Sequence, residues 1–145
     1  RSFLNFLKNN YNVKIYIAAH PTTKKNYFKD FKLIKNKTAQ LIKSCSLTIA
    51  HQSTSTNFPI IYKKKILFIT TDEIDNTHLG STIKSLATYL DTKPINLSQN
   101  YNRKLIEKKI TNTKQYNKFM DNFIKHPQSL QKDIGLVLKN IFMEK

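Results

Sequence analysis

The sequence predicts an α/β domain built on a mainly parallel sheet of about four or more strands. Short apolar, β-branched runs alternate along the chain with segments whose apolar residues recur at helical spacing. With 145 residues, the chain is long enough to bury the core of one ordinary domain. Strands that alternate with helices form parallel sheets, because each crossover helix packs back onto the sheet.

The first half of the chain contains two expected strands, each preceded by a helix. Apolar residues over 3–7 indicate a helix, and VKIYIAA at 13–19 follows as a strand covered on both faces. A second helix is expected over 38–45 with Thr38 as its N-cap, and a short strand over 46–51.

The middle of the chain contains the clearest strand, KILFITT at 65–71. The helix before it is expected to begin near Asn57 or Phe58, because Pro59 is best tolerated in a first turn. The helix after it is expected over 78–90, where leucines and isoleucine recur at helical spacing.

The last part of the chain completes the alternation and then becomes helical. KPINLS at 93–98 is expected as a fourth strand, and NRKLIEKKI at 102–110 as the helix that follows. From about residue 114 onward we expect two helices, broken at His126 by the proline that follows it.

The formal net charge of +16 raises the question of a nucleic-acid partner. Arginine stands only at positions 1 and 103, whereas lysine, asparagine and isoleucine are all over-used, which indicates a compositional bias of the source proteome. A nucleic-acid reader would use more arginine, whose planar fork matches phosphates and guanine edges. We therefore predict no nucleic-acid partner; a basic nucleic-acid-binding domain remains an alternative that steep salt dependence would reveal.

Several classes of protein are excluded by what the sequence lacks. The single cysteine, Cys45, rules out an intramolecular disulfide framework and a cysteine-rich zinc site. Glycine stands only at positions 80 and 135, so neither GxGxxG nor GxxxxGK[ST] occurs, and dinucleotide dehydrogenases and P-loop NTPases of those types are excluded. No apolar run is long enough to span a bilayer and no signal-peptide pattern is visible, so we expect a cytoplasmic protein.

Polar side chains follow each of the first three expected strands. His20 and residues 22–25 follow the first strand, residues 51–56 the second, and residues 70–73 the third. In open α/β sheets ligands bind outside the carboxyl ends of the strands. We therefore expect a ligand site at this edge of the sheet.

Each of these clusters has a structural and a functional interpretation. The hydroxyls of 53–56 can cap a helix, which needs only one of them, or bind an anion together with the helix N–H groups. His20 can simply end a strand, or donate a hydrogen bond to a phosphate oxygen or shuttle a proton. Asp72 and Glu73 can bind a ribose hydroxyl or a metal, or remain solvated.

Together, IAAHP at 17–21 and TAQLIKSCSLTIAHQSTSTNFPIIYKKKILFITTDE at 38–73 resemble the C-terminal, donor-binding half of GT-B-fold glycosyltransferases. Those that build capsules and surface polysaccharides are most similar: bacterial sialyl- and polysialyltransferases, capsule-synthesis transferases and teichoic-acid-type glycerophosphate transferases. In them one strand ends in His-Pro and a later strand runs into Ser-Ser or Ser-Thr-Ser. The resemblance, over 13–75, implies a Rossmann-like three-layer domain, with nucleotide-sugar binding in 1–112 and a C-terminal helical extension of the same domain in 113–145.

The resemblance also implies a site. His20 would be catalytic, contacting the donor phosphate and helping the nucleotide to depart. Asp72 and Glu73 would approach the ribose and base of the donor. No cofactor would be needed, and no metal, because helix dipoles, His20 and hydroxyls can stabilise the leaving phosphate. The side chains that would bind the donor phosphate are Ser53, Thr54, Ser55, Thr22 and Lys24.

Two departures from the family bear on activity. The family commonly has Gly-Lys-Pro before the last strand, where this chain has three lysines, 63–65. The acidic general base of the sialyltransferase relatives lies in an N-terminal half that this chain does not contain. We therefore expect a glycosyltransferase that is incomplete without an acceptor domain.

The resemblance further implies the partners. These are a nucleotide-activated sugar or polyol phosphate as donor substrate, and a glycan or lipid-linked acceptor held by the missing domain. The enzyme would be cytoplasmic, with peripheral association with the inner face of the plasma membrane as a further expectation. The alternatives are a non-catalytic α/β ligand-binding module and a sugar-nucleotide epimerase-like domain.

Overall fold

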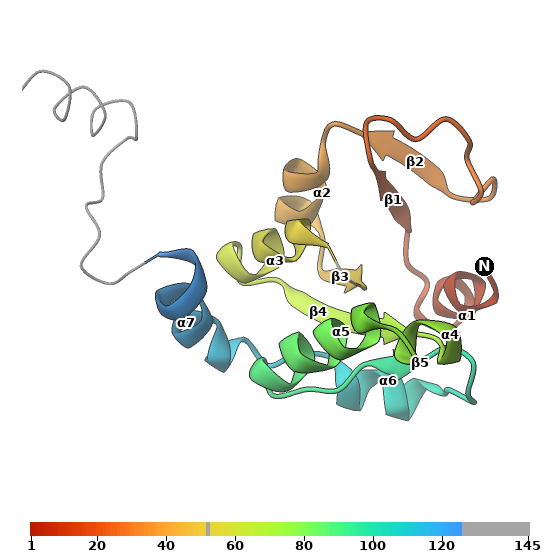
Figure 1. Ribbon diagram of the computed structural model, residues 1–145. Helices are drawn as coiled ribbons and strands as arrows, with labels where there is room; N and C mark the ends of the chain where they lie inside the picture. Colours follow the sequence, from red (N-terminus) through yellow and green to blue (C-terminus); the bar gives the residue numbers. More distant parts are fainter. Residues whose placement is uncertain (52, 126–145) are drawn as a thin grey trace, which may run out of the picture.

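The chain folds around its most apolar strand. The computed structural model describes residues 1–51 and 53–125, and within them the protein is mixed α/β with two small parallel sheets (Figure 1). One sheet pairs β1 with β2, and the other has the order β3-β4-β5. The strands are β1 (Tyr16–Ala19), β2 (Lys32–Lys35), β3 (Leu47–Ala50), β4 (Lys65–Thr70) and β5 (Ile95–Asn96).

The helices fall where the apolar spacing predicts them. Those expected near the N-terminus, over 38–45, from Asn57, over 78–90 and over 102–110 are all confirmed. The helices are α1 (Ser2–Tyr11), α2 (Thr38–Ser44), α3 (Asn57–Ile61), α4 (Asp72–Asp75), α5 (His78–Tyr89), α6 (Arg103–Lys109) and α7 (Tyr116–Phe119). Two 3₁₀ turns, η1 (Thr54–Thr56) and η2 (Thr113–Gln115), precede α3 and α7, and a π-helical turn, η3 (Met120–Ile124), follows α7.

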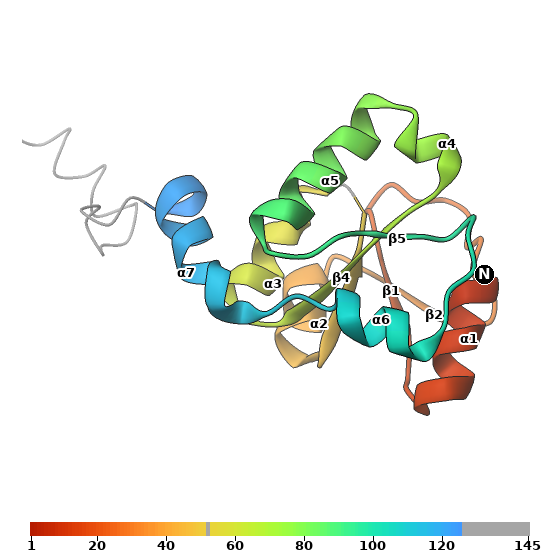
Figure 2. The same ribbon diagram turned by 90° about the horizontal axis from the view of Figure 1, so that it is seen from below.

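Helices cover both faces of β4, and this builds the core. Successive side chains of a strand point to opposite faces, so Ile66 and Phe68 join one apolar cluster while Leu67 joins another. Figure 2 shows β4 between α5 on one side and α6 on the other. The first cluster contains Ile60, Ile83, Ala87, Leu90, Tyr116 and Phe119, and the second contains Phe3, Leu7, Ile95 and Ile106.

The strands lie in two sheets rather than in a single sheet of four. The expected strands over 46–51, 65–71 and 93–98 pair with one another as predicted, all in parallel. β1 pairs instead with β2, and among the described residues no strand pairing joins β1 to β3. The α/β class and the parallel pairing are confirmed, whereas the described residues do not form the single sheet of about four or more strands that the sequence predicts.

β1 differs from the prediction in length and burial. The strand begins at Tyr16 rather than at residue 13, and Val13 and Tyr16 are 43% and 48% exposed. The expectation that both faces would be covered is wrong, because β1 has β2 as its partner in a narrow sheet that helices cover incompletely. The N-cap prediction for α2 is also wrong: Lys37 is the N-cap, and Thr38 is the first helical residue.

The chain from Thr113 to Ile124 is helical but irregular, passing from a 3₁₀ turn through α7 to a π-helical turn. The second expected helix and the break at His126 lie outside the described residues. The division of the chain at residues 112 and 113 stays a prediction.

A buried hydrogen-bond network ties this segment to the start of β4. Thr111 exchanges hydrogen bonds with Ile66: the Ile66 N–H donates to Thr111 Oγ1 (2.8 Å), and the Thr111 N–H donates to the Ile66 carbonyl (2.9 Å). The fully buried Tyr116 hydroxyl lies 2.7 Å from Thr111 Oγ1 and donates to the Lys64 carbonyl at 2.8 Å. Burial raises the pKa of Tyr116, partly opposed by the hydrogen bond with Thr111.

Candidate functional site

His20 follows β1 directly and is held by its own loop. Its Nδ1 lies 2.7 Å from Thr22 Oγ1, and the Thr22 N–H donates to the same nitrogen at 3.3 Å. An amide can only donate, so Nδ1 acts as the acceptor and, in the neutral ring, the proton belongs on Nε2. The imidazole is exposed, and within the described part of the chain Nε2 has no hydrogen-bond partner. His20 therefore presents an N–H donor to solvent.

The predicted phosphate contacts of this loop lie beside the histidine in sequence. Thr22 contacts His20 directly, and the Thr23 N–H donates to the His20 carbonyl at 3.0 Å, which closes the turn. Lys24, which follows that turn in the sequence, is exposed. Thr22 thus orients the imidazole, and because Nδ1 accepts, the Thr22 hydroxyl already donates its proton there.

The hydroxyl run follows β3 and leads into α3. Ser53 is the N-cap of η1: its Oγ accepts from the Ser55 N–H at 3.2 Å and lies 2.7 Å from the Ser55 hydroxyl. Thr54 is exposed. Thr56 is only 3% exposed, and its hydroxyl has no hydrogen-bond partner within the described structure. One hydroxyl is sufficient for the cap, as expected, and the others are not needed for it.

The acidic residues after β4 form a short helical turn. Thr71 is the N-cap of α4, and its Oγ1 accepts from the Ile74 N–H at 3.4 Å. An acidic first turn suits a helix N-terminus, because the carboxylates face the positive end of the helix dipole. Asp72 and Glu73 are both exposed on this turn.

Two residues of the β5 edge, missed by sequence reasoning, organise the acidic turn. The Asn96 side-chain amide donates to Asp72 Oδ1 at 2.7 Å and to Asp75 Oδ2 at 3.3 Å. The Ser98 hydroxyl accepts from the Asp72 N–H at 3.1 Å. The polar residues at the end of KPINLS are the sequence signal that could have identified them, because β5 is parallel to β4 and ends at the same edge of the sheet.

The carboxylates of this turn are stabilised in their ionised form. For Asp75, burial opposes ionisation, but hydrogen bonds from Thr70 and Asn96, together with Lys84, outweigh it and lower the pKa. The pKa of Glu73 is also lowered, mainly by a hydrogen bond with the side chain of Thr71. Of the two predicted ribose ligands, Asp72 is therefore partly engaged with Asn96, and Glu73 is the more accessible.

The structure brings some of the predicted site residues together and separates others. The hydroxyl run and the acidic turn follow neighbouring parallel strands, β3 and β4, and so share one sheet edge. His20 follows a strand of the other sheet, and Figure 1 shows the chain after β1 turning outward toward β2. Within the described residues no hydrogen bond links His20 to the run at 53–55.

Two surface hollows are lined by residues other than the predicted site residues. One, of about 450 Å³, is lined by Arg1, Lys25, Asn26, Tyr27 and Lys29, beside the β1–β2 loop. The other, of about 430 Å³, lies at the opposite edge of β4 and is lined by Lys65, Glu107, Ile110, Thr111, Asn112 and Thr113. Neither hollow includes His20 or the hydroxyl run.

In residues 1–51 and 53–125, no group of three or more histidine, cysteine, aspartate or glutamate side chains is placed to hold a metal ion. No helix in the same residues has the length and apolar character needed to cross a membrane. Comparison with protein-family models, curated proteins and solved structures finds no match to this chain.

Proposed function

We propose that the chain is the donor-binding half of a glycosyltransferase. Its substrate would be a nucleotide-activated sugar or polyol phosphate, used in the synthesis of a surface polysaccharide. The observation that carries the proposal is the arrangement of His20, whose Nδ1 is held by Thr22 so that the Nε2–H faces solvent at the end of a parallel strand. That geometry suits hydrogen bonding to a phosphate oxygen.

Two features of the fold support a Rossmann-like sheet. Every strand pairing in residues 1–51 and 53–125 is parallel. In addition, α2 contacts both β1 and α3, which is the arrangement expected if β1 and β3 are neighbours in one interrupted sheet. In that sheet the order would be β2-β1-β3-β4-β5, and His20 and the hydroxyl run would share an edge.

The backbone before β4 also supports the family assignment. Lys63 has φ of 51°, in the left-handed region that favours glycine. This is the position at which the similar glycosyltransferases carry the glycine of Gly-Lys-Pro. A glycine would adopt this φ without strain, so the backbone here could accommodate one.

The proposed reaction assigns each group one task. An acceptor hydroxyl attacks the activated carbon or phosphorus of the donor and forms the new bond to oxygen, while the bond to the nucleotide's phosphate oxygen breaks and that oxygen takes the electron pair. His20 Nε2–H and the hydroxyls of 53–55 stabilise the growing negative charge there. A carboxylate outside this chain takes the proton of the acceptor hydroxyl. Glu73, which is exposed and has a lowered pKa, would accept hydrogen bonds from the ribose.

Calorimetric titration with CMP, CDP, UDP and GDP tests donor binding. One nucleotide class should bind, and His20→Ala or the pair Ser53→Ala/Ser55→Ala should each weaken binding at least tenfold, since a hydrogen bond to a charged group contributes about 1.5–3 kcal/mol. His78→Ala and Ser81→Ala, at exposed positions of α5, are the matched controls and should bind normally. A folded protein that binds none of the four nucleotides refutes the proposal.

No strand pairing joins β1 to β3 in the described residues, and this favours one alternative, a non-catalytic ligand-binding module. In that case the hydroxyl run and the acidic turn form a site without His20. Binding would then be weakened by Ser53→Ala/Ser55→Ala and left unchanged by His20→Ala. Joined to an acceptor domain, such a module would produce no glycan. The transferase would produce glycan, and His20→Ala would abolish its turnover.

A further inference from the structure

The positive charge of this protein is concentrated in its first half. Residues 1–71 contain thirteen lysine or arginine residues and one carboxylate, a formal charge of +12, and the remaining residues carry twelve basic and eight acidic side chains, a formal +4. Lysine itself is spread evenly, with twelve in residues 1–71 and eleven in the remaining residues, as a compositional bias predicts, but such a bias would not remove acidic residues from one half. The asymmetry calls for a local explanation.

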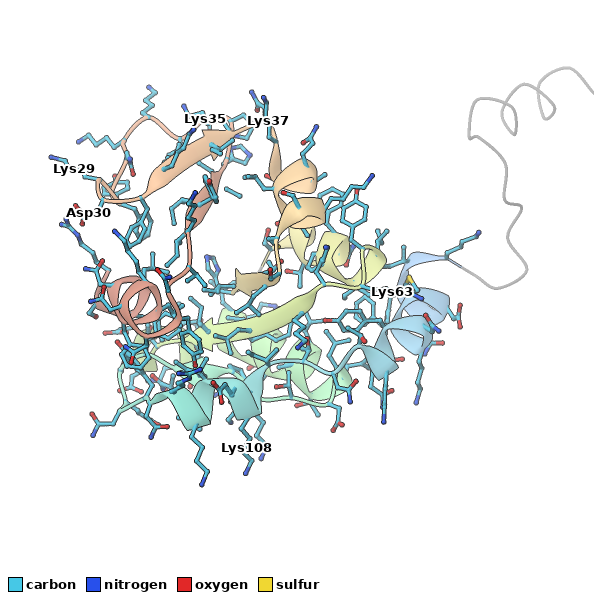
Figure 3. The ribbon with its side chains drawn as sticks, turned by 180° about the vertical axis from the view of Figure 1, so that it is seen from behind. Lys29, Asp30, Lys35, Lys37, Lys63 and Lys108 are labelled. Carbon is cyan, nitrogen blue, oxygen red and sulfur yellow. The ribbon has the colours of Figure 1, made fainter. Side chains whose placement is uncertain are left out.

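Within that half the charge is densest over residues 24–37, which we call the basic segment. Its six lysines are all exposed: Lys24, Lys25, Lys29, Lys32, Lys35 and Lys37. The one carboxylate of the segment, Asp30, accepts from Arg1 Nε at 2.6 Å and is neutralised by that arginine. Figure 3 shows Lys29 near the start of β2, Lys35 at its end and Lys37 just beyond it, all directed outward. The segment therefore presents uncompensated positive charge.

The turn at the start of the basic segment is ordered by short-range hydrogen bonds. Asn26 Oδ1 accepts from the Phe28 N–H at 2.9 Å, and the Phe31 N–H donates to the Phe28 carbonyl at 2.8 Å. Phe31 is buried and anchors the turn, whereas Tyr27 is 76% exposed at its tip. An aromatic residue with a polar end is thus held out among lysines, beside the hollow that Lys25 and Lys29 line.

We propose that the basic segment docks on the surface of an anionic lipid bilayer. Lysines near such a surface attract it without requiring a shaped pocket, and each contributes roughly a fivefold gain in partitioning. Tyrosine is enriched at the headgroup level of membranes, where its ring lies in the apolar boundary and its hydroxyl remains hydrated. The exposed Tyr27 amid lysines fits that boundary.

The composition of the segment favours lipid over nucleic acid. All its own cations are lysines, which are compact, strongly hydrated point charges, whereas phosphodiester recognition favours the planar fork of arginine. Single-stranded nucleic acid also requires several aromatic platforms along a groove, and here one aromatic side chain is largely exposed. The inference locates the membrane association expected of a surface-polysaccharide enzyme, but it does not depend on the donor site.

Vesicle flotation tests the proposal on the whole chain. The protein should bind vesicles of phosphatidylcholine mixed with phosphatidylglycerol, and not vesicles of phosphatidylcholine alone. The variant Lys24→Gln/Lys25→Gln/Lys29→Gln should bind on the order of a hundredfold more weakly. The matched control, Lys104→Gln/Lys108→Gln/Lys118→Gln, has the same net charge, and Figure 3 shows Lys108 on the side of the molecule opposite Lys35 and Lys37. The affinity of this control variant for the anionic vesicles should fall by less than tenfold.

Three results would overturn the proposal. The first is absence of binding to the anionic vesicles at low salt. The second is an equal loss in both triple variants, which would assign binding to net charge and not to the segment. The third is tighter binding to a single-stranded oligonucleotide than to anionic vesicles at the same salt. Because no nucleotide donor is present in the assay, these outcomes are separate from failure of the donor site.

Discussion

Replacing Tyr116 by phenylalanine tests how the last described helices are attached to the sheet. The hydroxyl is fully buried, lies 2.7 Å from Thr111 Oγ1, and donates to the Lys64 carbonyl at 2.8 Å. Phenylalanine keeps the ring and its packing against Phe119 and the face of β4, so the change isolates the two hydrogen bonds. The Lys64 carbonyl would lose this donor, and the Thr111 hydroxyl would lose one of its two partners.

The expected loss of stability is about 2 kcal/mol. An unsatisfied buried polar group costs about 1–3 kcal/mol, and Lys64 is half-buried, so water can partly replace the lost donor there. Thr111 keeps its bond with the Ile66 N–H, which limits the penalty on its side.

Urea unfolding followed by circular dichroism measures this loss. Tyr62→Phe is the control: Tyr62 is half-buried, and its hydroxyl makes no hydrogen bond within the described structure. The slope of the transition should be unchanged in both variants, since they expose similar surface on unfolding. If the free energy of unfolding of Tyr116→Phe lies within about 0.5 kcal/mol of that of Tyr62→Phe, the hydrogen-bond account is refuted.

Three further predictions concern stability. Gly80→Ala should destabilise the protein by about 2 kcal/mol, because a Cβ there would lie 2.6 Å from the Asp75 Cα. Ser81→Ala, the exposed control, should change stability little. Equal denaturation midpoints for the two variants would contradict the prediction. Lys63→Gly should stabilise the protein by up to about 1 kcal/mol, because glycine relieves the strain of the left-handed backbone. Lys65→Gly in β4 should destabilise it. A loss of stability in both variants would exclude backbone strain at residue 63. The lowered pKa of Asp75 contributes stability that is present above the unfolded-state pKa of aspartate and is lost as pH falls through the folded-state value. Asp75→Asn should therefore flatten the decline of melting temperature below about pH 4. An unchanged dependence of melting temperature on acid pH would contradict this.

Sequence reasoning predicted correctly the strands and helices that one long apolar pattern encodes. The run at 65–71 becomes the central strand because it is buried on both faces, and α5 follows the helical spacing of its leucines and isoleucine. β2 was not predicted. It has two apolar residues between lysines, and it is a strand only because β1 pairs with it, which is a tertiary effect.

For the candidate site, contacts close in sequence could be anticipated and distant ones could not. A hydroxyl two residues after His20 is within reach of its ring by local geometry alone, and the Ser53 cap of η1 is of the same kind. The Asn96 contacts with the acidic turn depend on the register of β5 against β4, and the pairing of β1 depends on the whole fold. Local residue types do not determine such registers.

The central claim is that His20 and Ser53 to Ser55 contact one donor phosphate. It is tested most directly by one NMR titration with CMP, CDP, UDP and GDP that follows the His20 imidazole and the amides of residues 53–55. The account predicts that with one nucleotide class both sets of resonances shift with a single shared dissociation constant, while His78 does not respond. Shifts in only one of the two sets, or in neither with any nucleotide, would contradict it.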